Sequence, residues 1–274
     1  MKIDKFKLCP IEPMVRIKAF CSAHSGIRPV GYFYSGESHD FWESVFILKG
    51  RAGITAGETV YTLEEGQMIF HPPGEFHRIW NEGDDFLRVV IVSFSVEYFP
   101  LEKHQICRFR PDDRVFSVVR DIRKIFVTDG IFLRALREPI DPVRVHKAVS
   151  NLENLFVELL GQVIEDLSIN VRRDKFSSLY STAIGVMKDN MSVRLSASDI
   201  AGTCGMSIST MQKLFRIYTG MGMMKYYESV RMQHARSLLE KGRMVKEVAI
   251  ELGYHDQNYF STAYKRFFGV SPRN

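Results

Sequence analysis

Polar side chains that could read a nucleic acid recur at helical spacing near residue 210. Ile208, Met211, Leu214 and Phe215 share the spacing of one helix face, so we expect them to face a core. The side chains left facing outward are Ser209, Thr210, Gln212, Lys213 and Arg216. Gln and Lys can hydrogen-bond base edges, and Ser or Thr can contact a base or a phosphate. The pattern predicts a DNA-reading helix over residues 207–218.

A second stretch repeats this arrangement near residue 260, in a helix expected over residues 256–267. Its apolar set is Tyr259, Phe260, Ala263, Tyr264 and Phe267. The outward polar set is Gln257, Asn258, Ser261, Thr262 and Lys265. Basic and hydroxyl side chains that we expect to contact phosphates are Arg194, Ser207, Lys246, Lys265 and Arg266.

The two helices belong to an internal repeat. Ala201 and Ala249 each stand four residues ahead of a glycine, at Gly205 and Gly253. The repeat offset is 48 residues before this turn and 49 residues after it. A short apolar helix, a Gly-centred turn and a second helix make a helix-turn-helix. Two such units in tandem suit successive major grooves of double-stranded DNA.

The charge distribution supports DNA as the partner. The whole chain has 37 Lys and Arg, 32 Asp and Glu, and a formal net charge of +5. Residues 171–274 alone hold 16 basic and 8 acidic residues, so the rest of the chain is slightly acidic. A basic excess confined to the repeat is the electrostatic footprint expected for phosphates.

The first part of the chain alternates short strands and turns. Apolar runs such as residues 44–48 and 86–94 are separated by Gly50, by a hairpin signal at residues 56–58 and by Pro72-Pro73-Gly74. Many short strands with closely spaced turns indicate a small β-barrel or sandwich. We expect this domain to occupy residues 1–110.

Helical patterns follow over residues 111–170, ahead of a repeat-bearing domain expected at 171–274. Asp112 and Asp113 can cap one helix, and Asp141-Pro142 can begin a longer one. The longer helix has a heptad stripe, made of Val145, Val149, Leu152, Phe156, Leu159, Val163 and Leu167. A second apolar row lies beside it: Ala148, Leu155, Leu160 and Ile164. We expect one row to pack on the strand domain and the other to form a homodimer; the alternative is that both rows are core.

The cysteines and the N-terminus indicate a cytoplasmic protein. Cys9, Cys21, Cys107 and Cys204 are scattered, with no CxxC, which favours reduced thiols. The first fifteen residues contain no apolar segment of a signal peptide. No apolar run approaches the length of a membrane span.

The repeat-bearing part resembles the AraC/XylS-type transcription regulators. The resemblance covers residues 176–272 and includes Ile200-Ala201, Gly205-Met206-Ser207, Phe215, Gly220, Tyr226, Arg231, Ala235, Leu238-Leu239, Val248-Ala249, Gly253-Tyr254, Tyr259-Phe260, Tyr264, Phe267, Gly269 and Pro272. It implies two helix-turn-helix units joined by a long helix over residues 223–239. It also implies DNA contacts from Ser209, Gln212, Lys213, Gln257, Asn258 and Thr262. Relatives usually continue to a final Tyr-Arg pair, whereas this chain ends at Asn274.

The strand domain resembles a cupin. Gly31, Glu37, His39, Glu43 and Gly50 follow the first cupin motif, except that Glu37 replaces the first histidine of metal-binding cupins. The second motif is complete: Gly66, Pro72, Gly74, His77 and Asn81.

The resemblance implies that Glu37, His39, Glu43 and His77 converge inside the barrel. This set suits a divalent metal, a polar pocket for a hydroxylated ligand such as a sugar, or a structural role. We favour the ligand pocket and add Trp42 and Trp80 to it as aromatic surfaces.

The chain is therefore predicted to be a two-domain α+β protein with a cupin-like β-barrel, a helical segment and an all-α double helix-turn-helix. It is expected to regulate transcription under the control of a small-molecule effector. The resemblance favours activation through RNA polymerase. The alternative is a metal-binding cupin enzyme, an isomerase or oxygenase, fused to a DNA-binding domain. No GxSxG, P-loop or dinucleotide motif supports other catalysis.

Overall fold

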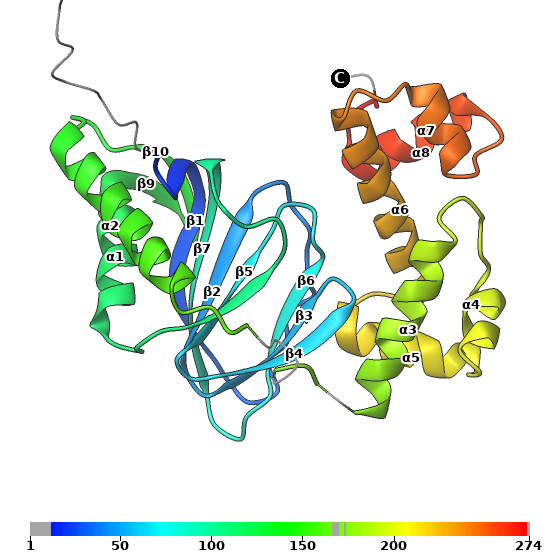
Figure 1. Cartoon of the computed structure of the whole chain (residues 1–274), viewed down its shortest axis with the longest axis horizontal. Coiled ribbons are helices and arrows are strands. Elements are labelled where there is room, and N and C mark those ends of the chain that lie inside the picture. The colour runs from blue at the N-terminus through cyan, green and yellow to red at the C-terminus, as the bar shows by residue number, and fades with distance from the viewer. Residues whose placement is uncertain (1–11, 166–169, 173, 273–274) are drawn as a thin grey trace, which may run out of the picture.

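The computed structural model describes residues 12–165, 170–172 and 174–272, and it has a sheet-rich half and a helical half (Figure 1). The sheets lie in the middle of the view, with the helices of residues 113–160 on one side and those of residues 175–268 on the other. None of the described helices is long and apolar enough to cross a membrane.

Two antiparallel sheets enclose the interior of the barrel. The strands of the cupin-like region are β1 (Arg16–Arg28), β2 (Trp42–Lys49), β3 (Arg51–Ala56), β4 (Thr59–Glu64), β5 (Gln67–His71), β6 (His77–Asn81), β7 (Leu87–Tyr98) and β8 (Gln105–Arg108). The larger sheet has the order β8-β5-β2-β7-β1-β10-β9, in which β9 is Phe126–Asp129 and β10 is Phe132–Leu136. The smaller sheet has the order β4-β3-β6. The two-domain α+β architecture predicted from the sequence is confirmed.

Strand β2 shows how the sequence separates two cores. Val45 and Ile47 pack inside the barrel with Ile54 of β3 and other buried residues. Phe46 and Leu48 point to the other face, where the helices cover the sheet. Because successive side chains of a strand alternate between faces, Glu43 lies on the inner face and Trp42 on the outer one.

The outer face is covered by α1 (Asp113–Ile125) and α2 (Pro142–Leu160). Their expected caps are present, since the side chains of Asp112 and Asp141 accept hydrogen bonds from the N–H groups of Arg114 and Arg144. The structure also has a hairpin in this segment, β9 (Phe126–Asp129) and β10 (Phe132–Leu136), which extends the larger sheet beside β1. The sequence did not predict this hairpin, because the apolar stripe of α1 runs into β9 without a break.

Both apolar rows of α2 pack against the barrel. The buried side chains of this helix come from both rows: Ala148, Leu152, Leu155, Phe156 and Leu159. The helix ends at Leu160, so Val163 and Ile164 lie beyond it, and Leu167 lies outside the described residues. The expectation of one intramolecular row and one dimer row does not match this packing. The outward apolar side chains that α2 retains are Val143 and Val157.

The helical half contains the predicted repeat. Its helices are α3 (Lys175–Asp189), α4 (Ala197–Thr203), α5 (Ile208–Thr219), α6 (Met223–Glu240), α7 (Val245–Glu251) and α8 (Gln257–Phe268). Helices α4 and α7 differ by 48 residues at both ends, and α5 and α8 differ by 49. The first turn ends at the N-cap Ser207 and the second at the N-cap Asp256, so the second turn is one residue longer.

Each helix-turn-helix unit has its own core, and α6 contributes to both. Met211, Leu214 and Phe215 of α5 pack with Tyr180 and Tyr226. Phe260, Ala263 and Tyr264 of α8 form the second core with Val248 of α7 and Met232 of α6. Three residues expected in these cores are exposed instead: Ile208, Tyr259 and Phe267. Ile208 and Tyr259 lie in the first turns of their helices, where the helix projects beyond its core.

Candidate nucleic-acid interface and barrel cavity

The outward face of α5 carries exposed Ser209, Lys213 and Arg216. The Ser207 hydroxyl caps the helix by accepting from the Thr210 N–H at 3.1 Å. It lies 2.9 Å from the hydroxyl of Ser209 and 2.9 Å from that of Thr210. These hydroxyls therefore gather at the N-terminal end of α5, where N–H groups and the helix dipole favour an anion such as a phosphate.

Gln212 lies against α6, unlike the other members of the predicted set. Its Oε1 atom accepts a hydrogen bond from the Met223 N–H at 3.3 Å. The N-cap of α6 is Gly222, which has no side chain to do this. Gln212 thus satisfies one of the unpaired N–H groups at the start of α6. The sequence could not show this role, because it depends on how α5 and α6 meet.

The outward face of α8 carries exposed Asn258, Thr262, Lys265 and Arg266, and half-buried Gln257 and Ser261. Two of these side chains have partners within the protein. The Thr262 hydroxyl donates to the Asn258 carbonyl at 2.9 Å, and Arg266 donates to Glu228 of α6 at 3.3 Å. Asn258 and Lys265 are therefore the exposed side chains of this face that are most available to contact DNA.

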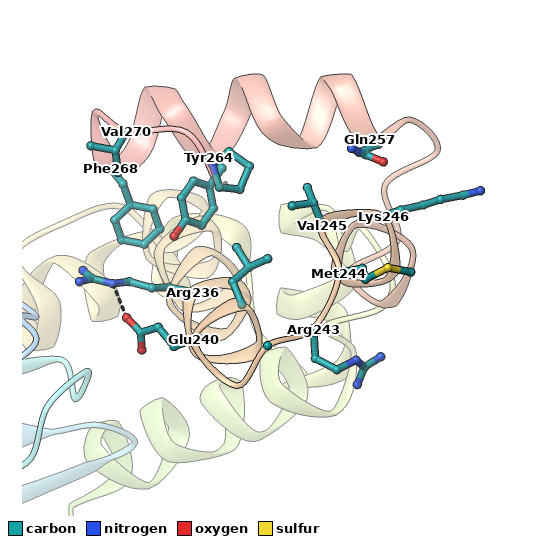
Figure 2. A pocket seen from close by; sticks show the side chains of 13 residues that line it. Arg236, Glu240, Arg243, Met244, Val245, Lys246, Gln257, Tyr264, Phe268 and Val270 are labelled. Atoms are coloured by element: carbon teal, nitrogen blue, oxygen red, sulfur yellow. Dashed lines mark hydrogen bonds and ion pairs between the residues drawn. The ribbon is translucent and has the colours of Figure 1, made fainter. Parts of the chain in front are cut away.

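A groove of about 940 Å³ runs between α8 and the end of α6 with the start of α7 (Figure 2). Gln257 and Lys246 lie at one end of it, and Phe268 with the Arg236–Glu240 ion pair lies at the other. The predicted phosphate contact Lys246 is exposed, and it lies beside Gln257 at the start of α8.

The barrel encloses a second, smaller space of about 160 Å³. The predicted residues Glu37, His39, Glu43 and His77 all line it. Other polar and aromatic side chains complete the wall: Ser22, His24, Arg28, Tyr32, Tyr34, Phe41, His71, Arg78, Ser93 and Phe132. The cavity is small beside the roughly 300–1,000 Å³ of pockets for drug-sized ligands.

The strand register brings the cavity wall together at Glu43. Glu43 of β2 stands opposite His71 of β5 and Ser93 of β7. The Ser93 hydroxyl donates to Glu43 Oε2 at 2.9 Å. His71 could have been predicted, because it follows the inward-facing Ile69 by two residues on one strand.

Four side chains place their ligand atoms within 4.8 Å of one another: Glu37, His39, Glu43 and His77. The Nε2 atoms of His77 and His39 lie 3.3 and 3.8 Å from the Glu43 carboxylate. Burial by itself would raise the pKa of Glu43, but the two imidazoles hold that pKa well below its usual range. Burial would likewise lower the pKa of His77, and Glu43 raises it instead.

The donor set fits a divalent cation. The Nδ1 atoms of His39 and His77 face the carbonyls of Phe41 and Glu75, at 2.9 and 3.1 Å. Such backbone contacts fix the rings of metal-binding histidines. Both Nε2 atoms are buried and lack a hydrogen-bond partner among the described residues. A cation between these atoms and the carboxylates would satisfy them.

Neither predicted tryptophan lines the cavity. Trp42 is buried on the outer face of β2, where its ring lies 4.8 Å from that of Phe99. Trp80 lies over Gly53, where a Cβ would be 2.0 Å from the indole, and its ring lies 6.1 Å from that of Tyr218 on α5. Both predictions were wrong: Trp42 alternates with Glu43 on β2, and Trp80 points to the helical half. Tyr32, Tyr34 and Phe132 provide aromatic surface in the cavity instead.

A second buried carboxylate lies behind the cavity. Glu75 lies 2.7 Å from His71 Nδ1 and 2.5 Å from His104 Nδ1. Burial acts to raise the pKa of Glu75, but its bonds to these imidazoles lower it to about 2. Burial and the neighbouring His77 lower the pKa of His71 to about 4. His71 is therefore neutral at pH 7 and contributes to both the cavity wall and this network.

Residues 200–274 match a helix-turn-helix domain family, and residues 29–93 match a cupin domain family. The HTH-type transcriptional activator RhaR of Escherichia coli O139:H28 (strain E24377A / ETEC) is 31% identical over 251 residues, which are 87% of this chain and 86% of that activator. An uncharacterized HTH-type transcriptional regulator, YidL of Escherichia coli (strain K12), is 26% identical over 238 residues, 84% of this chain and 73% of YidL.

The crystal structure of unsaturated fatty acid bound wild-type ToxT from Vibrio cholerae strain SCE256 aligns with 93% of this chain and 94% of its own. Its sequence identity to this chain is 14% and the TM-score is 0.36.

Proposed function

Because the chain belongs to the AraC/XylS family of transcription regulators, we propose that it reads DNA with α5 and α8 under the control of a small molecule in the barrel. The observation that carries this proposal is the repeat itself. Two helix-turn-helix units of matching helix lengths are held on one shared helix, α6. A single chain can then present two recognition helices to successive major grooves.

The proposed readers differ between the two units. In the first, Ser209, Lys213 and Arg216 are exposed; the equivalent positions in the second are Asn258, Thr262 and Lys265. We assign the three cations mainly to phosphates and to guanine edges, and Asn258 to a base edge. Thr210, Ser261, Gln257 and Arg266 complete the proposed surface, whereas Gln212 positions α6.

The proposed effector is a small hydroxylated molecule, of which a sugar is one class. The cavity offers carboxylates, imidazoles, the Arg28 guanidinium and tyrosine hydroxyls within about 160 Å³. Such a wall can accept and donate many hydrogen bonds to a compact polar ligand. The ligand residues proposed are Glu37, His39, Glu43 and His77, with Tyr32 and Tyr34 replacing the two tryptophans.

A divalent cation at these four residues is a second candidate. The observation that favours it is the pair of buried Nε2 atoms that face the Glu43 carboxylate but form no hydrogen bond among the described residues. Bound there, a cation would supply Lewis acidity or anchor the effector; the former is what a cupin isomerase or oxygenase would need.

Metal analysis and thermal unfolding distinguish these candidates. A metal site predicts about one equivalent of metal in the purified protein, lost in His39→Ala and His77→Ala but retained in His24→Ala, a cavity histidine outside the cluster. A metal-free pocket predicts no stoichiometric metal. It also predicts a raised melting temperature with one compound of a sugar and metabolite panel, because a ligand that binds only the folded state stabilises it.

We also propose a homodimer and contact with RNA polymerase as the output. The helical segment 111–170 remains the proposed dimerisation element between a barrel at 1–110 and the DNA-binding domain at 171–274. Its exposed Val143 and Val157, on one helix, support a limited apolar contact. Analytical ultracentrifugation of the Val157→Glu variant tests it, since a dimer through this face would dissociate.

A further inference from the structure

The segment from Tyr32 to Phe41 lies between the barrel cavity and the helical half. Five of its side chains line the cavity: Tyr32, Tyr34, Glu37, His39 and Phe41. It is attached to β6 by two isolated bridges, Phe33 with Trp80 and Glu37 with His77. Two residues between the cavity-lining ones reach the helical half: Ser35 lies against Gly220 at the end of α5, and Asp40 pairs with Arg236 of α6.

The first contact joins this segment to the end of α5 through Arg78. The buried guanidinium of Arg78 donates to the carbonyl of Tyr34 and to the carbonyls of Arg216, at 2.9 Å, and Ile217. The Thr55 hydroxyl of β3 donates to the next carbonyl, that of Tyr218, at 2.7 Å. Carbonyls in the last turn of a helix lack partners within the helix, although that of Arg216 also accepts from the Gly220 N–H at 3.1 Å. The barrel therefore caps the first recognition helix.

The second contact is a close approach of two backbones. Gly220 ends α5 in the left-handed conformation, with φ of 70°. A Cβ at this position would lie 2.4 Å from the Ser35 carbonyl oxygen. Ser35 follows the cavity residue Tyr34, so a shift of the segment changes the space available to the end of α5.

The third contact reaches the helix that both units share. Asp40 forms an ion pair with Arg236 of α6 at 2.8 Å. Asp40 lies between His39 and Phe41, which both line the cavity. One short segment thus contacts the cavity, the first recognition helix and the shared helix.

We propose that the segment Tyr32–Phe41 transmits the occupancy of the cavity to both helix-turn-helix units. This inference rests on the proposed function. Lys213 and Arg216 line a groove together with Tyr32, Phe33 and Trp80 of the barrel. A DNA phosphate that approaches these cations meets the barrel side chains. DNA binding therefore requires the segment to withdraw from α5, and by linkage a ligand that moves the segment changes the affinity for DNA.

Hydrogen exchange of the full chain, with DNA as the probe, tests this role. The duplex is one selected from a random pool by the full-length protein. The reporters are the amides of Tyr34 and Glu37, which donate to the carbonyls of Ile79 and His77 at 2.9 and 3.0 Å. We expect their exchange to be faster in the DNA complex by about fivefold or more, the lower end of typical coupling between sites.

A matched pair of variants separates this segment from the rest of the domain boundary. Asp40→Asn removes the ion pair with Arg236, and we expect about twofold to fivefold tighter DNA binding. Glu58→Gln removes the same charge from another pair across the boundary, with Lys188 at 3.1 Å, and we expect no comparable change.

Two results would overturn the inference. One is tight DNA binding with unchanged exchange at Tyr34 and Glu37, and the other is an equal gain of affinity in Glu58→Gln and Asp40→Asn. A wild-type protein that selects no duplex would instead contradict the proposed function.

Discussion

Glu75 and Gln212 show how single side chains differ from what their types suggest. Glu75 was not among the predicted site residues, yet it is bound on both sides by imidazoles behind the cavity. Gln212 has the side chain of a base reader, yet its carbonyl oxygen is held by α6. Glu75 meets His71 from four residues earlier and His104 from 29 residues later, and Gln212 meets Met223 from eleven residues later. Each contact depends on how two elements meet, which the apolar and polar pattern of one segment does not reveal.

The Glu75 network should make stability depend on pH. Its folded pKa of about 2 lies below the usual value of 4.5, so its contribution is present above pH 4.5 and is lost as the pH falls toward 2. Glu75→Gln should lower the unfolding free energy at pH 7 by about 1–3 kcal/mol. Urea unfolding of both proteins over a pH series measures this. A difference that stayed constant down to the lowest pH would refute the charged network.

Alanine substitutions of the neighbours Gln212 and Lys213 should have different effects, one on stability and the other on DNA binding. Gln212→Ala should cost about 1 kcal/mol of stability, as the loss of a helix N-terminal cap does. Lys213→Ala should leave stability unchanged but weaken binding to all DNA sequences, with a salt slope smaller by about 1. Thermal unfolding and salt titrations of DNA binding compare the two. If Gln212→Ala changed only base discrimination, its role as a cap would be wrong.

At the scale of helices and strands, the sequence was sufficient to predict the repeat but not every element. The repeat offsets of 48 and 49 residues were predicted and match the helices at both ends, because apolar spacing and turn glycines are local signals. The β9–β10 hairpin and the exposure of Ile208 were missed, and the packing of both α2 rows was the alternative to the expected dimer row. Each of these depends on which surface lies opposite, and a single sequence does not contain that information.

Gly220 and Gly269 are equivalent helix ends in different surroundings. Both are left-handed, with φ of 70° and 77°, but a Cβ on Gly269 would meet no atom within 4 Å, whereas one on Gly220 would meet Ser35. Gly269→Ala should lower the unfolding free energy by about 1–2 kcal/mol, because alanine is disfavoured in the left-handed conformation. Gly220→Ala should cost more, because the barrel must also move. Chemical denaturation measures both losses. If the two substitutions lowered the unfolding free energy equally, the barrel would not restrict the space at the end of α5.

At the scale of the molecule, the cupin half and the helical half meet in one apolar cluster. Val60 and Phe76 of the barrel are buried among Tyr180, Tyr226 and other residues of the first helix-turn-helix unit. The second unit has a separate core and meets the barrel region through the ion pair of Arg236 with Asp40. The first unit is therefore the one whose position depends most directly on the barrel.

The sequence predicted both halves and the residues that converge at Glu43, because glycines and histidines at fixed spacings mark them. It did not predict the contact between the halves. Arg78, Thr55 and Ser35 belong to no motif, and nothing in their local sequence marks them as contact residues. Their role is visible only where the carbonyls of α5 meet them.

Hydroxyl-radical footprinting on a selected duplex tests the central claim most directly. Two recognition helices on one chain predict two protected patches per protein, separated by about one helical turn, roughly 10–10.5 base pairs. Lys213→Ala should weaken one patch and Lys265→Ala the other. A single protected patch that both variants weaken equally would contradict reading by two helix-turn-helix units.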